Sequence, residues 1–591
     1  MKWNMSIADK RKNTFQLGAL ALSLTINILI LAIALIFSNM EFGTNDDRDI
    51  SNLLANVYGT DLGYYIPFVN IILTKSLSVL YAITNNVANW YVVCSLAAAF
   101  TSLTALGYVL IRRSRNAWIG MMLAFIMTGL LYENHYITFQ FTQNAALITM
   151  AGVVLLVDIL FFGWDKQELP QVILGSLLVL FGSLLRFQSV YFAFPYLLMY
   201  VGYELVFLKK ARGFSKWIGN RWKALVSIAV TLILVFAARG IHNYVYDSNP
   251  TLNAFYQEHL LRVELLDYGF PSYEENAEAI DELGLTEEDI QLFQKQCFLD
   301  KDVYSVDVLE SLVAMKSNTS NSVSLKNLRL SSVPNVLKVI KSDIHKNLFW
   351  QAMLVVALLF VMNTRYKRWL VLLGSMVVPL AMIWYFDSVN RMPYRVWYSV
   401  VAPAVISLIY ICAIDYRKIK IDRKKVVTVL RGAASNIAMA VIVLSVAVGV
   451  CQRAMEDDSV KITDDYERIL AVAEEHSNIF VLMDRPTISV LTYNSTISPL
   501  TCLDAGSQKN VCLMGGWICW TPGNLSALSN FNTSNVFQSI SEGMDVILVD
   551  ARNPEMKLSF IQRHYNENVC MKEIGTIGTA GIYRFYIQDN E

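Results

Sequence analysis

Long apolar runs separated by short polar segments dominate the chain. A bilayer core of about 30 Å needs about 20 apolar helical residues, and seven runs approach or exceed that length: 15–38, 90–111, 145–162, 191–208, 369–386, 396–414 and 433–450. Four shorter runs, 117–131, 172–185, 224–238 and 348–362, bring the prediction to about eleven membrane helices. The first run is too long for the apolar core of a signal peptide and lacks a small-residue cleavage site, so we expect a retained helix.

The direction of the helices follows from the basic residues between them. Lys and Arg cluster in every second inter-helix segment, and such segments face the cytoplasm in most membrane proteins. We therefore predict a cytoplasmic N-terminus and an extracytoplasmic C-terminal domain. The clusters fall at 10–12, 112–115, 209–223, 365–368 and 417–425.

Three segments are predicted outside the membrane: a first loop at 39–89, an insertion at 240–346 and a domain at 452–591. Residues 67–83 of the loop are apolar but interrupted by Lys75, which favours a helix lying on the membrane surface. The insertion has a helical pattern with a predicted N-cap at Thr286. The last segment is predicted to be α/β, with strands at 478–483, 545–549 and 582–587 and helices at 466–475 and 554–565.

The predicted fold class is thus an all-α polytopic membrane domain, residues 1–451, with a helical extracytoplasmic insertion and a C-terminal extracytoplasmic α/β domain. Composition agrees: 54% of the residues are hydrophobic and only 17% are charged, against about 25% charged in soluble chains. The net charge of zero argues against a nucleic-acid partner. Four cysteines of the last segment allow one or two disulfides: Cys502, Cys512, Cys519 and Cys570.

An acidic cluster opens the first outer loop. Asp46, Asp47 and Asp49 lie a few residues beyond the first apolar run. Carboxylates at this position could hold a divalent cation or act as a general base. Alternatively, Asp46 or Asp47 caps a helix that starts near Ile50, and the others are solvated.

Basic residues at the predicted outer ends of helices are candidate phosphate ligands, because an arginine there is costly without an anionic partner. The alternative is that they only anchor the helices, or that Arg391 and Arg395 pair with Asp387. The candidates are Arg186, Arg239, His242, Arg391 and Arg395.

Polar and aromatic side chains gather in a further outer loop, where Glu133 and His135 lie between tyrosines. Such a mixture suits a sugar, whose hydroxyls need polar partners and whose ring packs on aromatic faces. An interfacial aromatic belt would look the same. A nucleotide-binding loop of the P-loop or Rossmann type is absent from the sequence.

This architecture resembles the GT-C glycosyltransferases, membrane enzymes that take a sugar from a polyprenyl-phosphate carrier at the outer face. In sequence the resemblance depends on the acidic segment 45–49, Arg186 and the segment 262–273. It implies that Asp46 or Asp47 is the general base or a metal-side carboxylate. It also implies that Arg186, Arg391 or Arg395 neutralises the departing lipid phosphate. A Trp-Trp-Asp signature of oligosaccharyltransferases is missing, which disfavours protein N-glycosylation.

The expected function is therefore transfer of a sugar from a lipid-linked donor to a glycan or lipid acceptor of the cell envelope, with inversion. Two other classes stay open. A transporter or flippase of a lipid-linked precursor should carry charges at mid-membrane and repeated halves. A non-catalytic assembly factor would not need the acidic loop.

Overall fold

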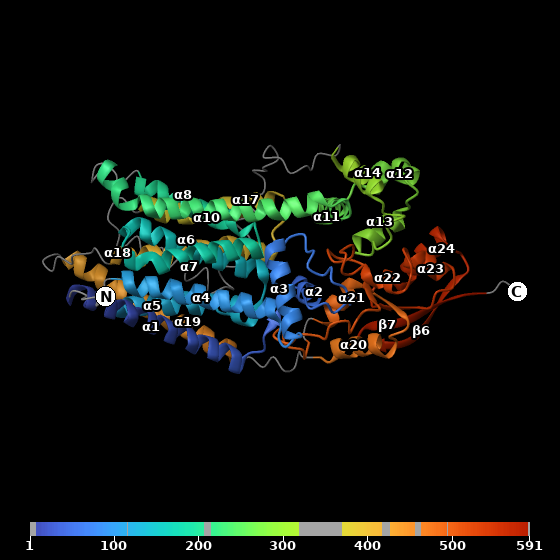
Figure 1. The fold of residues 1–591 in the computed structure, drawn as a ribbon, viewed down its shortest axis with the longest axis horizontal. Helices are drawn as coiled ribbons and strands as arrows, with labels where there is room; N and C mark the ends of the chain where they lie inside the picture. The colour runs from blue at the N-terminus through green and yellow to red at the C-terminus, as the bar shows by residue number, and fades with distance from the viewer. Residues whose placement is uncertain are drawn as a thin grey trace. The chain divides into compact units, whose positions relative to one another are not determined.

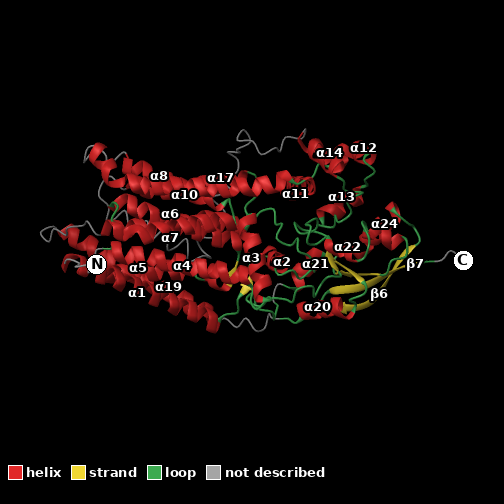
Figure 2. Cartoon of the chain, viewed as in Figure 1, coloured by secondary structure: helices red, strands yellow, loops and turns green. Residues whose placement is uncertain are grey.

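The chain divides into two units, each built from segments far apart in the sequence. The computed structural model describes residues 7–114, 116–205, 214–317, 369–389, 391–416, 426–454, 463–492 and 495–588. The helical unit consists of Met1–Met40, Cys94–Arg239 and Arg329–Asp457. The mixed unit consists of Glu41–Val93, Gly240–Leu328 and Asp458–Glu591. Figure 2 shows the five-stranded sheet of the mixed unit and the long helices of the helical unit.

Long apolar helices form the helical unit, and two of them, α4 and α10, extend into the mixed unit. The short elements η1 (Glu133–Ile137), β2 (Thr138–Phe139) and η2 (Lys166–Glu168) lie between helices. The helices are α1 (Ile7–Phe37), α4 (Trp90–Arg113), α5 (Ala117–Leu131), α6 (Phe141–Phe162), α7 (Leu169–Leu185), α8 (Ser189–Tyr203), α10 (Phe214–Ser248), α17 (Trp369–Ser388), α18 (Tyr394–Tyr416) and α19 (Val426–Ala454).

Ten of the eleven predicted apolar runs coincide with these helices, and the run at 348–362 lies outside the described residues. In the described part of the chain, seven helices are long and apolar enough to cross a membrane. The chain is accordingly a membrane protein. The side on which each terminus lies stays a prediction.

Helices α6 and α7 lie side by side at the centre of the helical unit (Figure 1). Their backbones approach closely at glycines, since a Cβ added to Gly152 would lie 2.5 Å from the carbonyl oxygen of Gly175. Small residues permit such contacts between membrane helices, where dispersion rather than water exclusion drives packing.

Buried ion pairs join the ends of these helices. Arg113 on α4 binds Asp158 on α6, with nitrogen–oxygen distances of 2.6–3.0 Å. Arg112 binds Glu168 in the same way, and Arg221 on α10 lies 2.6 Å from Glu204. Each guanidinium therefore has a carboxylate partner, and these ion pairs hold the helices together.

The mixed unit begins with the first outer loop and the insertion. Helix α3 confirms the predicted helix of the loop, although it begins at Ile71 because the Asn70 side chain caps it. Thr286 caps α13 through a capping box with Asp289, as the sequence predicts. The elements are β1 (Glu41–Phe42), α2 (Asn45–Leu54), α3 (Ile71–Thr84), α11 (Pro250–Tyr268), α12 (Tyr273–Glu282), α13 (Glu287–Gln294) and α14 (Val306–Ser317).

The C-terminal segment forms a five-stranded sheet in the order β4-β3-β5-β7-β6, in which β4, β3 and β5 are parallel and β7 and β6 are antiparallel. The three predicted strands and two predicted helices are present within two residues of the expected ends. The remaining elements were not predicted. The elements of the C-terminal segment are α20 (Asp465–Glu475), β3 (Phe480–Met483), α21 (Arg485–Leu491), β4 (Val511–Leu513), α22 (Ser526–Asn530), α23 (Val536–Ser541), β5 (Val546–Asp550), α24 (Pro554–His564), β6 (Val569–Ile577) and β7 (Ala580–Ile587).

The insertion and the C-terminal segment share one hydrophobic core. Phe298 of the insertion packs edge-on against Trp520, with ring centroids 5.1 Å apart, and also stacks on Phe293. The three segments predicted outside the membrane thus correspond to one unit, whereas the sequence assigned the loop and the insertion to the membrane domain. All eight cysteines are unpaired, so the disulfides that the sequence allowed are not formed.

Candidate functional site

The acidic cluster of the first loop lies at the start of α2. This helix begins at Asn45, after an extended Thr44, and not near Ile50 as the capping alternative assumed. Asp46 and Asp47 therefore occupy its first turn, where negative charge is favoured by the unpaired backbone N–H groups. They do not act as the N-cap residue.

Asp47 is fully buried and ties α2 to a membrane helix. Its Oδ1 accepts a hydrogen bond of 2.9 Å from the hydroxyl of Tyr91, and its Oδ2 accepts one of 3.1 Å from Thr44. Tyr91 belongs to the first turn of α4, a candidate membrane span. The acidic turn is consequently fixed at the end of a helix long enough to cross the bilayer.

Asp46 and Asp49 share one guanidinium. Arg485 lies 3.3 Å from Oδ1 of Asp46 and 2.7 Å from Oδ2 of Asp49. The exposed fractions of the Asp46, Asp49 and Arg485 side chains are 18%, 11% and 13%. Asp46 is thus the most accessible carboxylate of the cluster, and it is held in place by a charge-assisted hydrogen bond.

Burial dominates the electrostatics of this group. It raises the pKa of Asp49, although Arg485 opposes the shift. Burial alone would lower the pKa of Arg485, but the charges of Asp49 and Asp46 raise it above its ordinary value. The guanidinium is therefore permanently charged and keeps both aspartates beside it.

A buried network fixes the backbone that carries Arg485. Asp484 ends strand β3 and caps α21 by accepting from the N–H of Thr487 at 3.0 Å. Lys557 on α24 donates to Asp484 at 2.8 Å and also to Asp550, at the end of the neighbouring strand β5. Lys557 is 2% exposed and joins the carboxyl ends of two parallel strands.

A glycine turn covers Arg485 from another side. Gly515 and Gly516 follow β4, and Gly516 has a φ of +72°, a backbone conformation that favours glycine. A Cβ added to Gly516 would lie 3.0 Å from Nε of Arg485. Only a residue without a side chain permits this approach at this φ.

A small pocket of about 20 Å³, lined by both polar and apolar side chains, borders the same arginine. Asp49, Arg48 and Arg485 contribute charged side chains to its lining, and Arg48 lies over the ring of Tyr466 at 4.5 Å. The pocket is formed by residues Asn45, Arg48, Asp49, Asn52, Tyr58, Tyr466, Ile469, Met483, Arg485, Ile488, Ser489, Thr492, Gln508 and Leu513.

Two of the predicted phosphate ligands are linked through aromatic rings in the helical unit. Arg186 follows the last residue of α7, and its guanidinium lies 5.4 Å from the ring centre of Phe141. Arg239 lies 5.4 Å from the ring centre of Phe187, the residue after Arg186. Cation–π contacts of this kind place the two arginines near each other.

The polar loop of η1 lies against the start of α18. His135 is buried, and its Nε2 lies 3.1 Å from the hydroxyl of Tyr398. Glu133 is 3.6 Å from Arg453. Arg395 lies one residue after the start of α18, and Arg391 precedes that helix.

His242 lies on α10 within the mixed unit and is fully buried. Its Nδ1 accepts a hydrogen bond of 3.2 Å from the N–H of Ile71, at the start of α3. It therefore fastens the loop to the end of a second candidate membrane span. This contact gives His242 a structural role.

The predicted site residues thus fall into two groups. Asp46, Asp47 and His242 belong to the mixed unit, and the structure brings the acidic turn together with Arg485, which the sequence analysis missed. Arg485 lies two residues after the end of the predicted strand at 478–483, and this position was the available signal. The convergence of both groups on one pocket stays a prediction. The group in the helical unit comprises Glu133, His135, Arg186, Arg239, Arg391 and Arg395.

The carboxylates of the acidic turn are bound by different partners. Asp47 points to Tyr91, and Asp49 is bound by Arg485. In the described part of the chain, no three His, Cys, Asp or Glu side chains form a group that could hold a metal. The divalent cation expected at Asp46, Asp47 and Asp49 stays a prediction.

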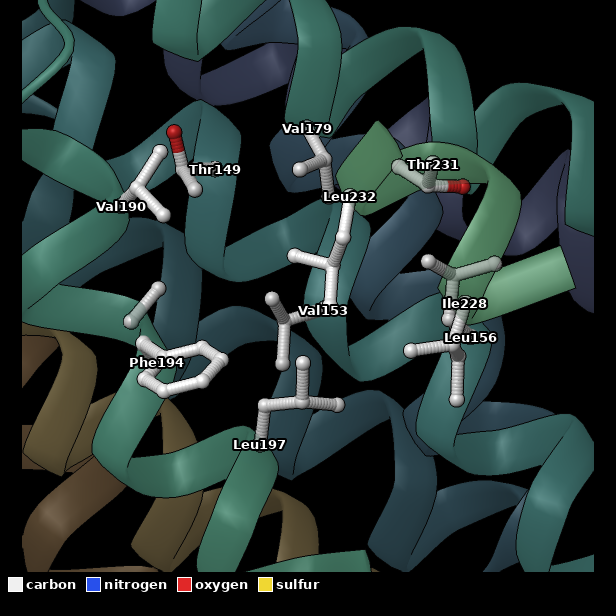
Figure 3. A pocket seen from close by; sticks show the side chains of 11 residues that line it. Thr149, Val153, Leu156, Val179, Val190, Phe194, Leu197, Ile228, Thr231 and Leu232 are labelled. Carbon is white, nitrogen blue, oxygen red and sulfur yellow. The ribbon is translucent and has the colours of Figure 1, made fainter. Parts of the chain in front are cut away.

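A separate apolar cavity of about 20 Å³ lies among α6, α7, α8 and α10 in the helical unit (Figure 3). Thr149 and Thr231 are its only polar side chains, and Thr149 binds Ser189 at 2.7 Å. It is a packing space without ionisable groups.

Comparison with known proteins gives a remote structural similarity. No protein-family model matches the chain, and no curated protein matches it. Among solved structures, the chain is similar to ArnT from Cupriavidus metallidurans, crystallised bound to undecaprenyl phosphate. The TM-score is 0.45 and the identity is 10%, over 96% of this chain and 98% of ArnT. A similarity this remote establishes neither the family of the chain nor its substrate.

Proposed function

We propose that the chain is a membrane glycosyltransferase. It moves a sugar from a polyprenyl-phosphate carrier to a glycan or lipid acceptor of the cell envelope, at the outer face of the membrane. The membrane provides the donor, and the mixed unit provides the catalytic carboxylate.

The observation that carries this proposal is the position of Asp46. Its carboxylate is partly accessible, is oriented by Arg485 and lies next to Asp47, which is bonded to the first turn of a candidate membrane span. A base at this position can meet a lipid-linked substrate whose reacting headgroup lies at the membrane surface. A soluble substrate would not require a base attached to the end of a membrane helix.

In the proposed reaction, Asp46 takes the proton of an acceptor hydroxyl while that oxygen bonds to the anomeric carbon. The bond from this carbon to the carrier's phosphate oxygen breaks, and its electron pair leaves with the phosphate. A single displacement of this kind inverts the anomeric configuration. Cationic side chains stabilise the negative charge on the leaving group.

The test is sugar transfer by the full-length protein in proteoliposomes that contain a panel of radiolabelled polyprenyl-phosphate sugars and envelope lipid acceptors. Loss of a general base costs about 10²- to 10⁴-fold in rate, so we expect Asp46→Asn to lower transfer by at least about 100-fold. Asp61→Asn, an exposed aspartate of the same loop, is the matched control. Undiminished transfer by Asp46→Asn would overturn the role of Asp46.

A further inference from the structure

One buried arginine of the mixed unit has no carboxylate partner. Arg262 on α11 is 8% exposed, yet it forms no ion pair with any residue that the structure describes. Its hydrogen bond runs from Nη2 to Nδ1 of His259, a neutral acceptor, at 3.1 Å. Burying a guanidinium without a nearby anion is costly, so such groups are usually paired.

The charges around Arg262 show where it lies. Burial lowers its pKa to about 10, and Asp267 opposes the shift from beyond ion-pairing distance. Asp46 and Arg485 are also close enough to influence its pKa, in opposite directions. Arg262 therefore lies within electrostatic range of the proposed base.

A second unsatisfied donor belongs to the same neighbourhood. Trp517 is 7% exposed, and its indole N–H has no hydrogen-bond partner among the described residues. Phe68 packs edge-on against Trp517 with ring centroids 4.7 Å apart, and its ring centre is 6.5 Å from that of His259. Trp517 also follows Gly516, which contacts Arg485.

These contacts form a continuous chain from Arg262 through His259, Phe68 and Trp517 to Arg485, which binds Asp46. It contains two buried groups that can only donate hydrogen bonds, a guanidinium and an indole N–H, and neither has an acceptor of matching strength. An anion with several acceptor oxygens would satisfy both.

We infer that Arg262 and Trp517 form a binding site for a phosphoryl group, beside Asp46. This inference rests on the proposed function, and it assigns the anionic headgroup of the carrier to the mixed unit instead of the arginines of the helical unit. The planar guanidinium donates two parallel hydrogen bonds to phosphate oxygens. The neutral His259 keeps Arg262 oriented by accepting one of its other N–H groups.

The test is equilibrium binding to the full-length protein in nanodiscs free of polyprenyl phosphate. Three probes are compared: radiolabelled undecaprenyl phosphate, undecaprenol and inorganic phosphate. Truncating one partner of a buried charge-assisted contact costs about 10- to 100-fold or more in affinity. We expect Arg262→Ala to lower the affinity for undecaprenyl phosphate by this factor and to leave the affinity for undecaprenol unchanged.

Two further variants secure the result. Trp517→Phe keeps the contact with Phe68 but removes the N–H, and we expect about a threefold to tenfold loss for undecaprenyl phosphate. If Arg262→Ala fails to fold, Trp517→Phe tests the phosphoryl site on its own. Arg584→Ala is the matched control, because Arg584 is 51% exposed on β7 and pairs with Asp545; it should bind like the wild type.

The outcomes separate the two proposals. Wild-type binding that neither Arg262→Ala nor Trp517→Phe weakens would overturn the inference and leave the proposed function standing. A wild-type protein that does not discriminate undecaprenyl phosphate from undecaprenol would contradict both. If inorganic phosphate loses affinity in the variants as well, the site takes the phosphoryl group itself; if only the lipid does, the site needs the headgroup in its membrane setting.

Discussion

Buried arginines have opposite surroundings in the two units. In the helical unit, Arg112, Arg113 and Arg221 are each matched by a buried carboxylate. In the mixed unit, Arg262 is equally buried, but among the described residues it forms no ion pair and is hydrogen-bonded to a neutral histidine. Closed pairs hold helices together, whereas a desolvated charge without a counterion is available to a ligand.

Arg485 is intermediate between these cases. It is paired, but with two aspartates of which one, Asp46, stays partly accessible. Lys557 and its two buried aspartate partners fix the backbone that carries Arg485. An accessible charge supported by a closed network is the arrangement expected of a functional site.

The largest effect should come from breaking a closed pair. Arg113→Met leaves Asp158 buried without its cation, and such changes cost about 3–5 kcal/mol. We expect a marked loss of thermal stability in detergent. The double variant Arg113→Met, Asp158→Leu should recover most of the loss, because it removes both charges. Equal instability of the single and double variants would contradict the pair's role as a matched unit.

A smaller effect is expected at the anchor of the acidic turn. Tyr91→Phe removes the hydroxyl that donates to Asp47 and leaves a buried carboxylate oxygen without this donor, which costs about 1–3 kcal/mol. We expect lower thermal stability together with lower sugar transfer. Tyr586→Phe, at an exposed position of β7, is the control and should change neither. Normal stability of Tyr91→Phe would show that Asp47 does not anchor the turn.

The smallest effect on stability is expected at Arg262. Because this guanidinium has no anionic partner to lose, Arg262→Met should change the free energy of unfolding by less than about 1 kcal/mol, or increase it. The thermal unfolding of Arg262→Met in detergent is compared with that of Arg113→Met. A loss as large as that of Arg113→Met would mean that Arg262 is a structural residue.

Much of the fold could be predicted from the sequence, because its strongest signals are local. Long apolar runs locate the membrane helices, and short apolar runs locate β3 and β5. Strand β6 has mostly exposed or half-buried residues and carries no apolar run, so it was missed. The sequence delimited the three segments, and their position outside the membrane stays a prediction. It did not indicate their assembly into one unit, which depends on contacts between residues hundreds of positions apart.

The candidate site shows the same division. Asp46 and Asp47 were recognised because several carboxylates stand together in the sequence. Arg485 is a single basic residue two positions after a predicted strand, and Arg262 is only the first residue of the segment 262–273, to which the sequence assigned no role. Their importance appears only when tertiary packing buries them and places one against Asp46 and Asp49, while the other is left unpaired.

The most direct test of the central claim is an electron cryo-microscopy structure of the protein in nanodiscs with undecaprenyl phosphate bound. The account predicts phosphate density about 3 Å from the guanidinium nitrogens of Arg262, beside the Asp46 carboxylate. Phosphate density at Arg186, Arg239, Arg391 or Arg395, with Arg262 and Asp46 remote from it, would contradict the account.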